Sequence, residues 1–245
     1  MPSSNAERAR RHWWIPERRR GVEYLDDPRA VGADVVLAEL ADVSRANALF
    51  GGTRAVVAEV LALCDGPTPP RSLLDVGTGL GDIPLAARRA TARRGVALDV
   101  MGLELSDVAA RAAHAAIGAA VVADAFALPF PTGSVDVVTC SQVLHHFDAV
   151  QGARLLRELD RVARVRVIVS DLRRSWAAAI GLWLASYPLG FHPHSRHDGV
   201  TSVMRGFTQF ELGTLILDST SRPAVTRNRV GFRITAHWSP TSAPT

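Results

Sequence analysis

The segment that most constrains the fold is residues 73–82, which read Leu-Leu-Asp-Val-Gly-Thr-Gly-Leu-Gly-Asp. The apolar start predicts a buried strand, and the glycines that follow it predict a tight turn leading into a helix. Glycine lets the backbone of such a turn lie against a ligand, because no Cβ stands in the way. We therefore expect a nucleotide cofactor at this turn.

Spacing and charge indicate which cofactor. A dinucleotide fingerprint, Gly-x-Gly-x-x-Gly, would need its third glycine at position 82, where this chain has Asp82. Asp75 and Asp82 bracket the turn, so a pyrophosphate would meet like charge. S-adenosylmethionine (SAM) has no phosphate and carries a cationic ammonium and sulfonium, so the acids favour it. The contacts that we expect in this turn are Asp75, Gly77, Thr78, Gly79 and Gly81.

Two further acids follow the next predicted strands. Glu104 ends the second strand, where its carboxylate can accept bonds from both ribose hydroxyls, whereas Asp99 comes too early in that strand. Asp124 follows the third strand and can accept the adenine amino group while Phe126 flanks the ring, although a helix cap explains Asp124 equally well. The further cofactor contacts that we expect are Glu104, Leu105, Asp124, Ala125, Phe126 and Ser141.

Strands and helices alternate through the chain. We expect strands at 72–76, 100–105, 120–123, 135–140, 165–170, 224–229 and 232–237, and helices within 35–63 and at 83–91, 108–117, 153–163 and 209–217. This order predicts an α/β fold with a doubly wound, Rossmann-like, mostly parallel sheet. The carboxyl ends of its parallel strands then share one edge, where ligands bind.

Four stretches match a known family: 74–81 (Leu-Asp-Val-Gly-Thr-Gly-Leu-Gly), 102–106 (Gly-Leu-Glu-Leu-Ser), 124–136 (Asp-Ala-Phe-Ala-Leu-Pro-Phe-Pro-Thr-Gly-Ser-Val-Asp) and 143–147 (Val-Leu-His-His-Phe). They resemble the class I SAM-dependent methyltransferases, in particular the branch similar to ubiquinone and menaquinone methylases. Thr78 departs from the Cys that this family often has. More loosely, 46–52 and 196–208 look like the methyltransferases that accompany type III polyketide synthases, which implies a role in secondary metabolism.

The order of the expected elements along the chain predicts a domain layout. Residues 1–70 form an N-terminal arm and helical cap, and residues 71–245 form the SAM-binding methyltransferase domain, with a lid insert at about 172–208. In the lid we expect an acceptor wall of Trp176, Trp183, Tyr187 and Phe191.

Histidines are the candidate catalytic residues. His145 and His146 follow the fourth strand at the cofactor edge, so either can accept a phenol proton; packing is the alternative role. Residues 191–199 (Phe-His-Pro-His-Ser-Arg-His-Asp-Gly) are expected to form a loop of the lid, with His197 as a further candidate base. Their spacing matches no closed metal motif, so we expect no metal. Asn47 is left open between a ligand contact and a solvent-facing residue.

The expected activity is O-methylation of a phenolic or polyketide-like hydroxyl on a small apolar molecule. C-methylation of an aromatic or quinone ring is the alternative, and a nucleic-acid-binding or non-catalytic SAM-binding protein is the alternative of another class. Six arginines in the first twenty residues suggest a nucleic-acid contact, but a solvated arm is the better interpretation. Nucleic-acid amine methylation would also need an Asn/Asp-Pro-Pro-aromatic motif where this chain has Ser-Gln-Val-Leu at 141–144.

Composition suggests the compartment. The two cysteines lie in apolar surroundings, and the N-terminus carries no signal-peptide pattern, so we expect a cytoplasmic protein. The uncharged run 175–191 is shorter than the roughly 20 residues of a transmembrane helix. A homodimer is left open.

Overall fold

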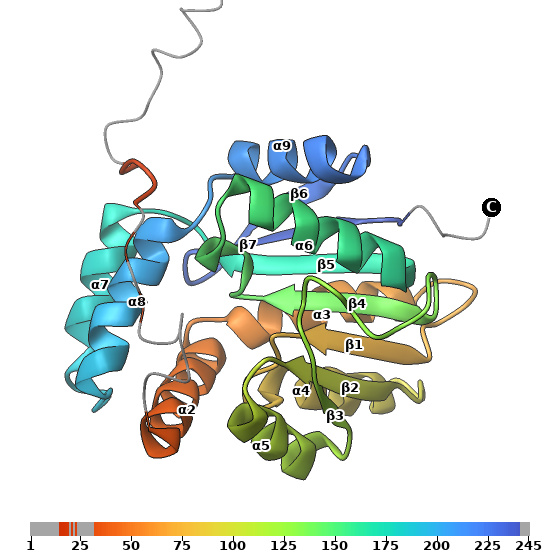
Figure 1. Cartoon of the computed structure of the whole chain (residues 1–245), viewed down its shortest axis with the longest axis horizontal. Helices are drawn as coiled ribbons and strands as arrows, with labels where there is room; N and C mark the ends of the chain where they lie inside the picture. The colour runs from red at the N-terminus through yellow and green to blue at the C-terminus, as the bar shows by residue number, and fades with distance from the viewer. Residues whose placement is uncertain (1–14, 20, 22, 24–31, 241–245) are drawn as a thin grey trace, which may run out of the picture.

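A computed structural model describes residues 15–19, 21, 23 and 32–240. Within these residues the chain forms one seven-stranded sheet of order β3-β2-β1-β4-β5-β7-β6 (Figure 1). The strands are β1 (Ser72–Val76), β2 (Asp99–Glu104), β3 (Ala120–Val122), β4 (Val135–Ser141), β5 (Ala163–Leu172), β6 (Val225–Arg229) and β7 (Arg233–Trp238). In this order, β3, β2, β1, β4 and β5 each pair in parallel with the next strand, and β7 pairs antiparallel with both β5 and β6. The predicted doubly wound, mostly parallel sheet is confirmed.

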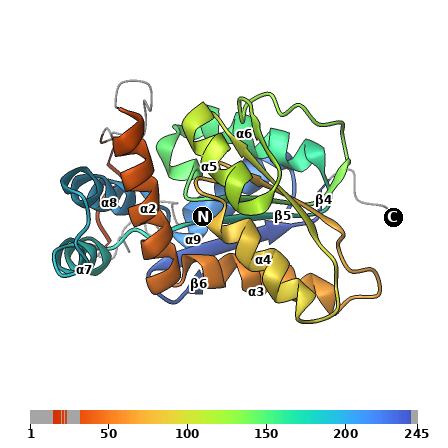
Figure 2. The same ribbon diagram turned by 90° about the horizontal axis from the view of Figure 1, so that it is seen from below.

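Helices cover both faces of the sheet. Those on the faces are α3 (Gly52–Cys64), α4 (Asp82–Ala92), α5 (Asp107–Ile117), α6 (Ala149–Val162) and α9 (Gln209–Thr220), and the chain also forms α2 (Ala33–Leu49), α7 (Trp176–Ser186) and α8 (Pro193–Arg205). Side chains alternate along each strand, so Leu73 packs with α3, α4 and α5, whereas its neighbour Leu74 packs with α6 and α9. Figure 2 shows α3 and α4 on the side of the sheet opposite α6.

The remaining helices lie beyond the carboxyl ends of the parallel strands. Figure 1 shows α2, α7 and α8 at this edge, facing the tips of the strand arrows. The strand order reverses between β1 and β4, which is the switch point at which open α/β sheets bind ligands. Among the described residues, no single helix is both long enough and apolar enough to cross a membrane.

The expectation of a loop over 191–199 is wrong, because α8 begins at Pro193. Proline suits the first helical position, since its missing N–H would have no partner there. His192 caps the helix, with its side chain accepting the backbone N–H of His194. Most of the histidine cluster therefore lies on the first turns of a helix.

Candidate active site

A cavity of about 820 Å³ lies at the switch point. Its walls come from α2, the glycine turn after β1, the ends of β2 and β4, and helices α7 and α8. Small-molecule sites typically measure roughly 300–1,000 Å³, so this cavity has room for a nucleoside cofactor and a small acceptor together. Every predicted cofactor contact except Gly81 lines it.

The glycine turn depends on the absence of side chains. Gly77, Gly79 and Gly81 have φ angles of +70°, +57° and +77°, which are left-handed values that favour glycine. A Cβ on Gly77 would also lie only 2.3 Å from Cγ2 of Val143. The N–H of Gly77 donates to the carbonyl of Leu103 at 2.8 Å, which ties the turn to the neighbouring strand. Gly81 serves as the N-cap of α4 rather than as part of the cavity wall.

Asp75 is the buried acid beneath this turn. Its side chain accepts the hydroxyl groups of Thr78 at 2.8 Å and Thr139 at 2.6 Å. Burial raises the pKa of Asp75 to about 7 although the two hydroxyl groups lower it, and the nearby charges of Asp82 and Glu104 make a smaller contribution in the same direction as burial. A cation bound at the turn would favour the ionised form of Asp75.

Glu104 ends β2 and faces the same cavity. Its carboxylate accepts the backbone N–H of Gly79 at 2.6 Å and of Leu105 at 3.2 Å. Burial nevertheless raises the pKa of Glu104. Asp99 lies at the exposed opposite end of the strand, which agrees with the choice of Glu104 over Asp99.

The loop after β3 supplies the far end of the cavity. Asp124 is exposed, and its carboxylate accepts the backbone N–H of Phe126 at 2.8 Å. The Phe126 ring packs edge-on against Phe147, with 4.8 Å between centroids. Asp124 thus stabilises its own turn and at the same time lines the cavity beside an aromatic ring.

Asn47 and Gln142 form a polar bridge that the sequence did not predict. Gln142 directly follows β4 with a φ of +57°, a strained value for a residue other than glycine. Its side-chain amide donates to Oδ1 of Asn47, and the Asn47 amide donates to Asp82 at 3.5 Å. The bridge joins α2, α4 and the end of β4 at the cavity wall. Asn47 is thus a buried cavity residue, and its solvent-facing alternative is wrong.

His145 is almost fully buried, with 2% of its side chain exposed. Its Nδ1 lies 2.7 Å from Oδ1 of Asp171, and its backbone N–H donates to the other oxygen of that carboxylate at 3.1 Å. Burial by itself lowers the pKa of His145, but the carboxylates of Asp171 and Glu23 outweigh it and raise this pKa to about 9. His145 is therefore an imidazolium at neutral pH.

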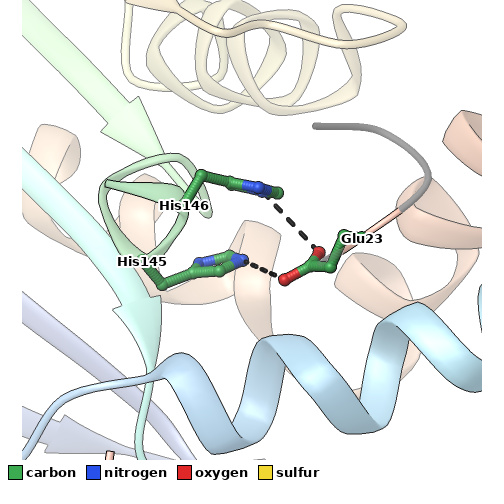
Figure 3. A group of neighbouring side chains, drawn as sticks. All are labelled: Glu23, His145 and His146. Carbon is green, nitrogen blue, oxygen red and sulfur yellow. Dashed lines mark ion pairs between the residues drawn. The ribbon is translucent and has the colours of Figure 1, made fainter. Parts of the chain in front are cut away.

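His146 is the more accessible of the pair, with 21% of its side chain exposed. Figure 3 shows the Glu23 carboxylate beside the two rings and facing both of them, and its oxygens are 3.8 Å from Nε2 of His145 and 3.8 Å from Nε2 of His146. Arg205 fixes this arrangement by donating to Glu23 at 3.1 Å and to the His146 carbonyl at 2.6 Å. Glu23 has no motif around it and lies far away in the sequence, so no sequence signal pointed to it.

The structure does not bring His197 together with this pair. His197 lies outside the cavity lining, its side chain is 61% exposed, and its Nδ1 lies 2.9 Å from Oδ1 of Asp198. Asp198, in contrast, is buried and lines the cavity.

The expected aromatic wall is wrong for three of its four members. Trp176, Trp183 and Tyr187 are 42%, 47% and 51% exposed and do not line the cavity, whereas Phe191 does. The face of α7 turned toward the cavity carries smaller residues, namely Ala177, Ala178, Gly181 and Leu182. The side of the cavity that α7 lines therefore has more space than it would have beside an aromatic wall.

Of the N-terminal arginines, Arg18 and Arg19 lie within the described residues. Arg18 donates to the Arg205 carbonyl at 2.7 Å and lies over the Phe207 ring at 4.3 Å. It belongs to the fold rather than to a solvated arm, while the stretch with Arg8, Arg10, Arg11 and Arg20 lies outside the described residues.

The sequence of the chain was compared with protein families and with known proteins. Residues 74–169 match the family described as methyltransferase domain. No curated protein sequence gave a significant match.

Solved structures share the fold at low identity. A neocarzinostatin-biosynthesis O-methyltransferase, solved with SAM and 2-hydroxy-5-methyl naphthoic acid, has a TM-score of 0.63 and 19% identity, over 91% of this chain and 62% of that chain. The magnesium protoporphyrin IX methyltransferase of Synechocystis PCC 6803, with bound S-adenosylhomocysteine (SAH), has a TM-score of 0.54 and 18% identity, over 78% of this chain and 84% of that chain.

The same Synechocystis protein with bound SAM has a TM-score of 0.53 and 15% identity, over 98% of this chain and 92% of that chain. With a methyltransferase domain over residues 74–169 and an acidic glycine turn at the switch point of the sheet, the chain is a SAM-dependent methyltransferase whose cofactor is S-adenosylmethionine.

Proposed function

We propose that this enzyme transfers the methyl group of SAM to a hydroxyl of a small phenolic or polyketide-like acceptor. The observation that carries the proposal is the pair His145 and His146, which lines the cavity with the Glu23 carboxylate facing Nε2 of both rings. Methyl transfer to an alcohol or phenol needs a group that removes a proton, whereas the sulfonium is already activated.

The predicted cofactor contacts define the end of the cavity at which SAM would bind. Glu104 would accept the ribose hydroxyls, and Asp124 the adenine amino group, with Phe126 against the ring. The ionised form of Asp75, below the turn, would attract the ammonium and sulfonium charges. Leu105, Ala125 and Ser141 complete this wall.

The two histidines would have different roles, His145 in positioning and His146 as the base. His145 is already protonated at neutral pH, so it cannot accept another proton; we assign it a positioning role, held by Asp171. His146 would take the phenolic proton on Nε2 as the oxygen attacks the methyl carbon. The carbon–sulfur bond would break as the carbon–oxygen bond forms, with its electron pair staying on sulfur, so that the products are the methyl ether and SAH. The Glu23 carboxylate would stabilise the imidazolium that forms on His146.

The acceptor end of the cavity supports an apolar ligand. Leu182 and Phe191 line it together with alanines of α7. The structural relative from neocarzinostatin biosynthesis holds a hydroxynaphthoic acid, which is consistent with an aromatic acceptor here. We retain α7 and α8, within residues 172–208, as the proposed lid, and residues 1–70 as the proposed cap. A cytoplasmic location, a role in secondary metabolism and a homodimer stay predictions.

Isotope-labelled SAM tests this proposal. The enzyme would be incubated with methyl-¹³C SAM and a panel of phenols, and the products analysed by mass spectrometry and NMR. We expect a methoxy carbon signal; a methyl group on a ring carbon would instead establish C-methylation. His146→Gln should lower kcat by about 10²–10⁴-fold with SAM affinity unchanged, whereas His114→Gln, on the exposed face of α5, should not. Equal activity of His146→Gln and wild type would show that His146 is not the base.

A further inference from the structure

A second cluster of ligating side chains lies where α2 meets the start of α8. Glu39 of α2, His192 at the N-cap of α8 and His194 within α8 each offer a ligand atom, and these atoms lie within 4.8 Å of one another. Nδ1 of His194 is 3.3 Å from Oε1 of Glu39. Neither the SAM contacts nor the histidine pair uses these three residues.

Glu39 is unusual among them because it is 1% exposed. Neither of its carboxylate oxygens accepts a hydrogen bond from any residue that the structure describes. The carboxylates of Asp198, Asp42 and Glu23 lie near enough to add negative charge around it. A buried carboxylate in this position is costly unless a cation or a strong donor meets it.

We propose that Glu39, His192 and His194 bind a divalent first-row transition-metal ion such as Zn²⁺. Zinc bonds to imidazole nitrogen and carboxylate oxygen measure about 2.0–2.1 Å, so two ligand atoms of a tetrahedral site lie about 3.3 Å apart. The separation between Glu39 and His194 has this value. Two histidines and one carboxylate leave a fourth position open, as in zinc sites that keep a water molecule.

Neighbouring contacts hold the histidines in place for such an ion. The backbone N–H of His192 donates to Oδ2 of Asp42 at 2.7 Å, and Asp42 is paired with Arg45. Nδ1 of His192 accepts the backbone N–H of His194 at 3.4 Å, which leaves Nε2 of His192 as its metal ligand. The first turn of α8 is thus oriented before the ion binds, and supporting contacts of this kind strengthen metal sites.

A similar trio at the active site lacks a buried carboxylate without hydrogen-bond donors. Glu23, His145 and His146 also cluster within 4.8 Å, but Glu23 lies 3.8 Å from each ring. Its oxygens accept the Ser202 hydroxyl at 2.6 Å and the Arg205 guanidinium at 3.1 Å. The carboxylate of Glu23 already has its donors and counter-charge, so we assign the metal to Glu39.

A metal at Glu39 would tie α2 to α8 and so brace one wall of the cavity, because Glu39 and Asp42 both line it. The inference does not rest on the proposed O-methylation, since metal binding is measured without any acceptor. If the protein binds no zinc, the proposed methyl transfer is unaffected. If the proposed methyl transfer is wrong, the zinc site is equally unaffected.

Equilibrium dialysis of the chelator-treated full chain against Zn²⁺, read by elemental analysis, tests the inference. Wild type should bind one Zn²⁺ per chain, and Co²⁺ in its place should give the visible absorption of a four-coordinate site. Glu39→Gln and His194→Asn should each weaken binding by more than about tenfold. The matched controls His197→Asn, on the exposed face of the same helix, and Glu23→Gln, in the other trio, should bind as wild type does.

Circular dichroism would verify that each variant folds, and His192→Asn replaces either cluster variant that does not. Substoichiometric Zn²⁺ in folded wild type would overturn the inference. So would unchanged binding by folded Glu39→Gln, or loss of binding in Glu23→Gln alone.

Discussion

Acidification should weaken SAM binding through Asp75. Its pKa is about 7 in the ligand-free protein, and a bound cation favours the ionised carboxylate. If SAM binds only that form, the affinity scales with the ionised fraction. Lowering the pH from 7.5 to 6.0 then reduces the affinity about eightfold, or roughly 1.3 kcal/mol. The α-amino group of the ligand, with a pKa of about 7.7–8.0, is protonated more fully at pH 6.0 than at pH 7.5, which offsets the loss of affinity by less than about twofold.

Isothermal titration with SAM at both pH values measures the effect. Burial also raises the pKa values of Asp82 and Glu104, which would steepen the dependence, so a variant must isolate the contribution of Asp75. Asp75→Asn should bind SAM more weakly than wild type. Its ratio of affinities at pH 7.5 and pH 6.0 should be about eightfold smaller than the ratio for wild type. The control Asp65→Asn, at an exposed surface carboxylate, should keep all of it. Equal affinity of wild type at the two pH values would refute the reasoning, as would an unchanged ratio in Asp75→Asn.

Three further predictions concern stability and the acceptor. Because the pKa of His145 rises from 6.5 to about 9 on folding, its stabilisation is complete below pH 6.5 and is lost as pH rises through 9; urea unfolding should show a loss on the order of 3 kcal/mol that His145→Gln abolishes, and an identical slope in that variant would contradict the assignment. Gly77→Ala should abolish SAH binding and lower the melting temperature more than Gly118→Ala, which has a similar φ but open space around its Cβ; equal effects would show that the contact at Gly77 is unimportant. Leu182→Ala should raise KM for the acceptor several-fold without changing KM for SAM, and Trp183→Ala, outside the cavity, should change neither; the reverse result would place the wall on the other face of α7.

The convergence of the predicted residues around the glycine turn could be predicted because the signals for it are local. In a parallel sheet the end of each strand reaches the same edge, so Asp75 and Glu104 needed only correct strand positions to be brought together. Glycine at positions 77 and 79 permits the positive φ angles that the turn adopts. Of the predicted cofactor contacts only Gly81 does not line the cavity, and it serves as the N-cap of α4.

The acceptor end was less predictable because it depends on tertiary packing. Which face of α7 turns inward is set by its contacts with α8, and the small residues pack there while Trp183 faces outward. Asp171 and Glu23 reach His145 from distant parts of the chain, and no spacing rule links them. Pro193 was a usable signal that the histidine cluster begins a helix.

The most direct test of the central claim is isothermal titration of the folded protein with SAH, run on wild type, Glu104→Ala and the control Asp99→Ala. Glu104 faces the cavity at the carboxyl end of β2, and Asp99 is exposed at the opposite end. We predict one binding site per chain, weakened at least tenfold in Glu104→Ala and unchanged in Asp99→Ala. Absence of SAH binding by folded wild type, or equal binding by all three proteins, would contradict the cofactor site described for this methyltransferase.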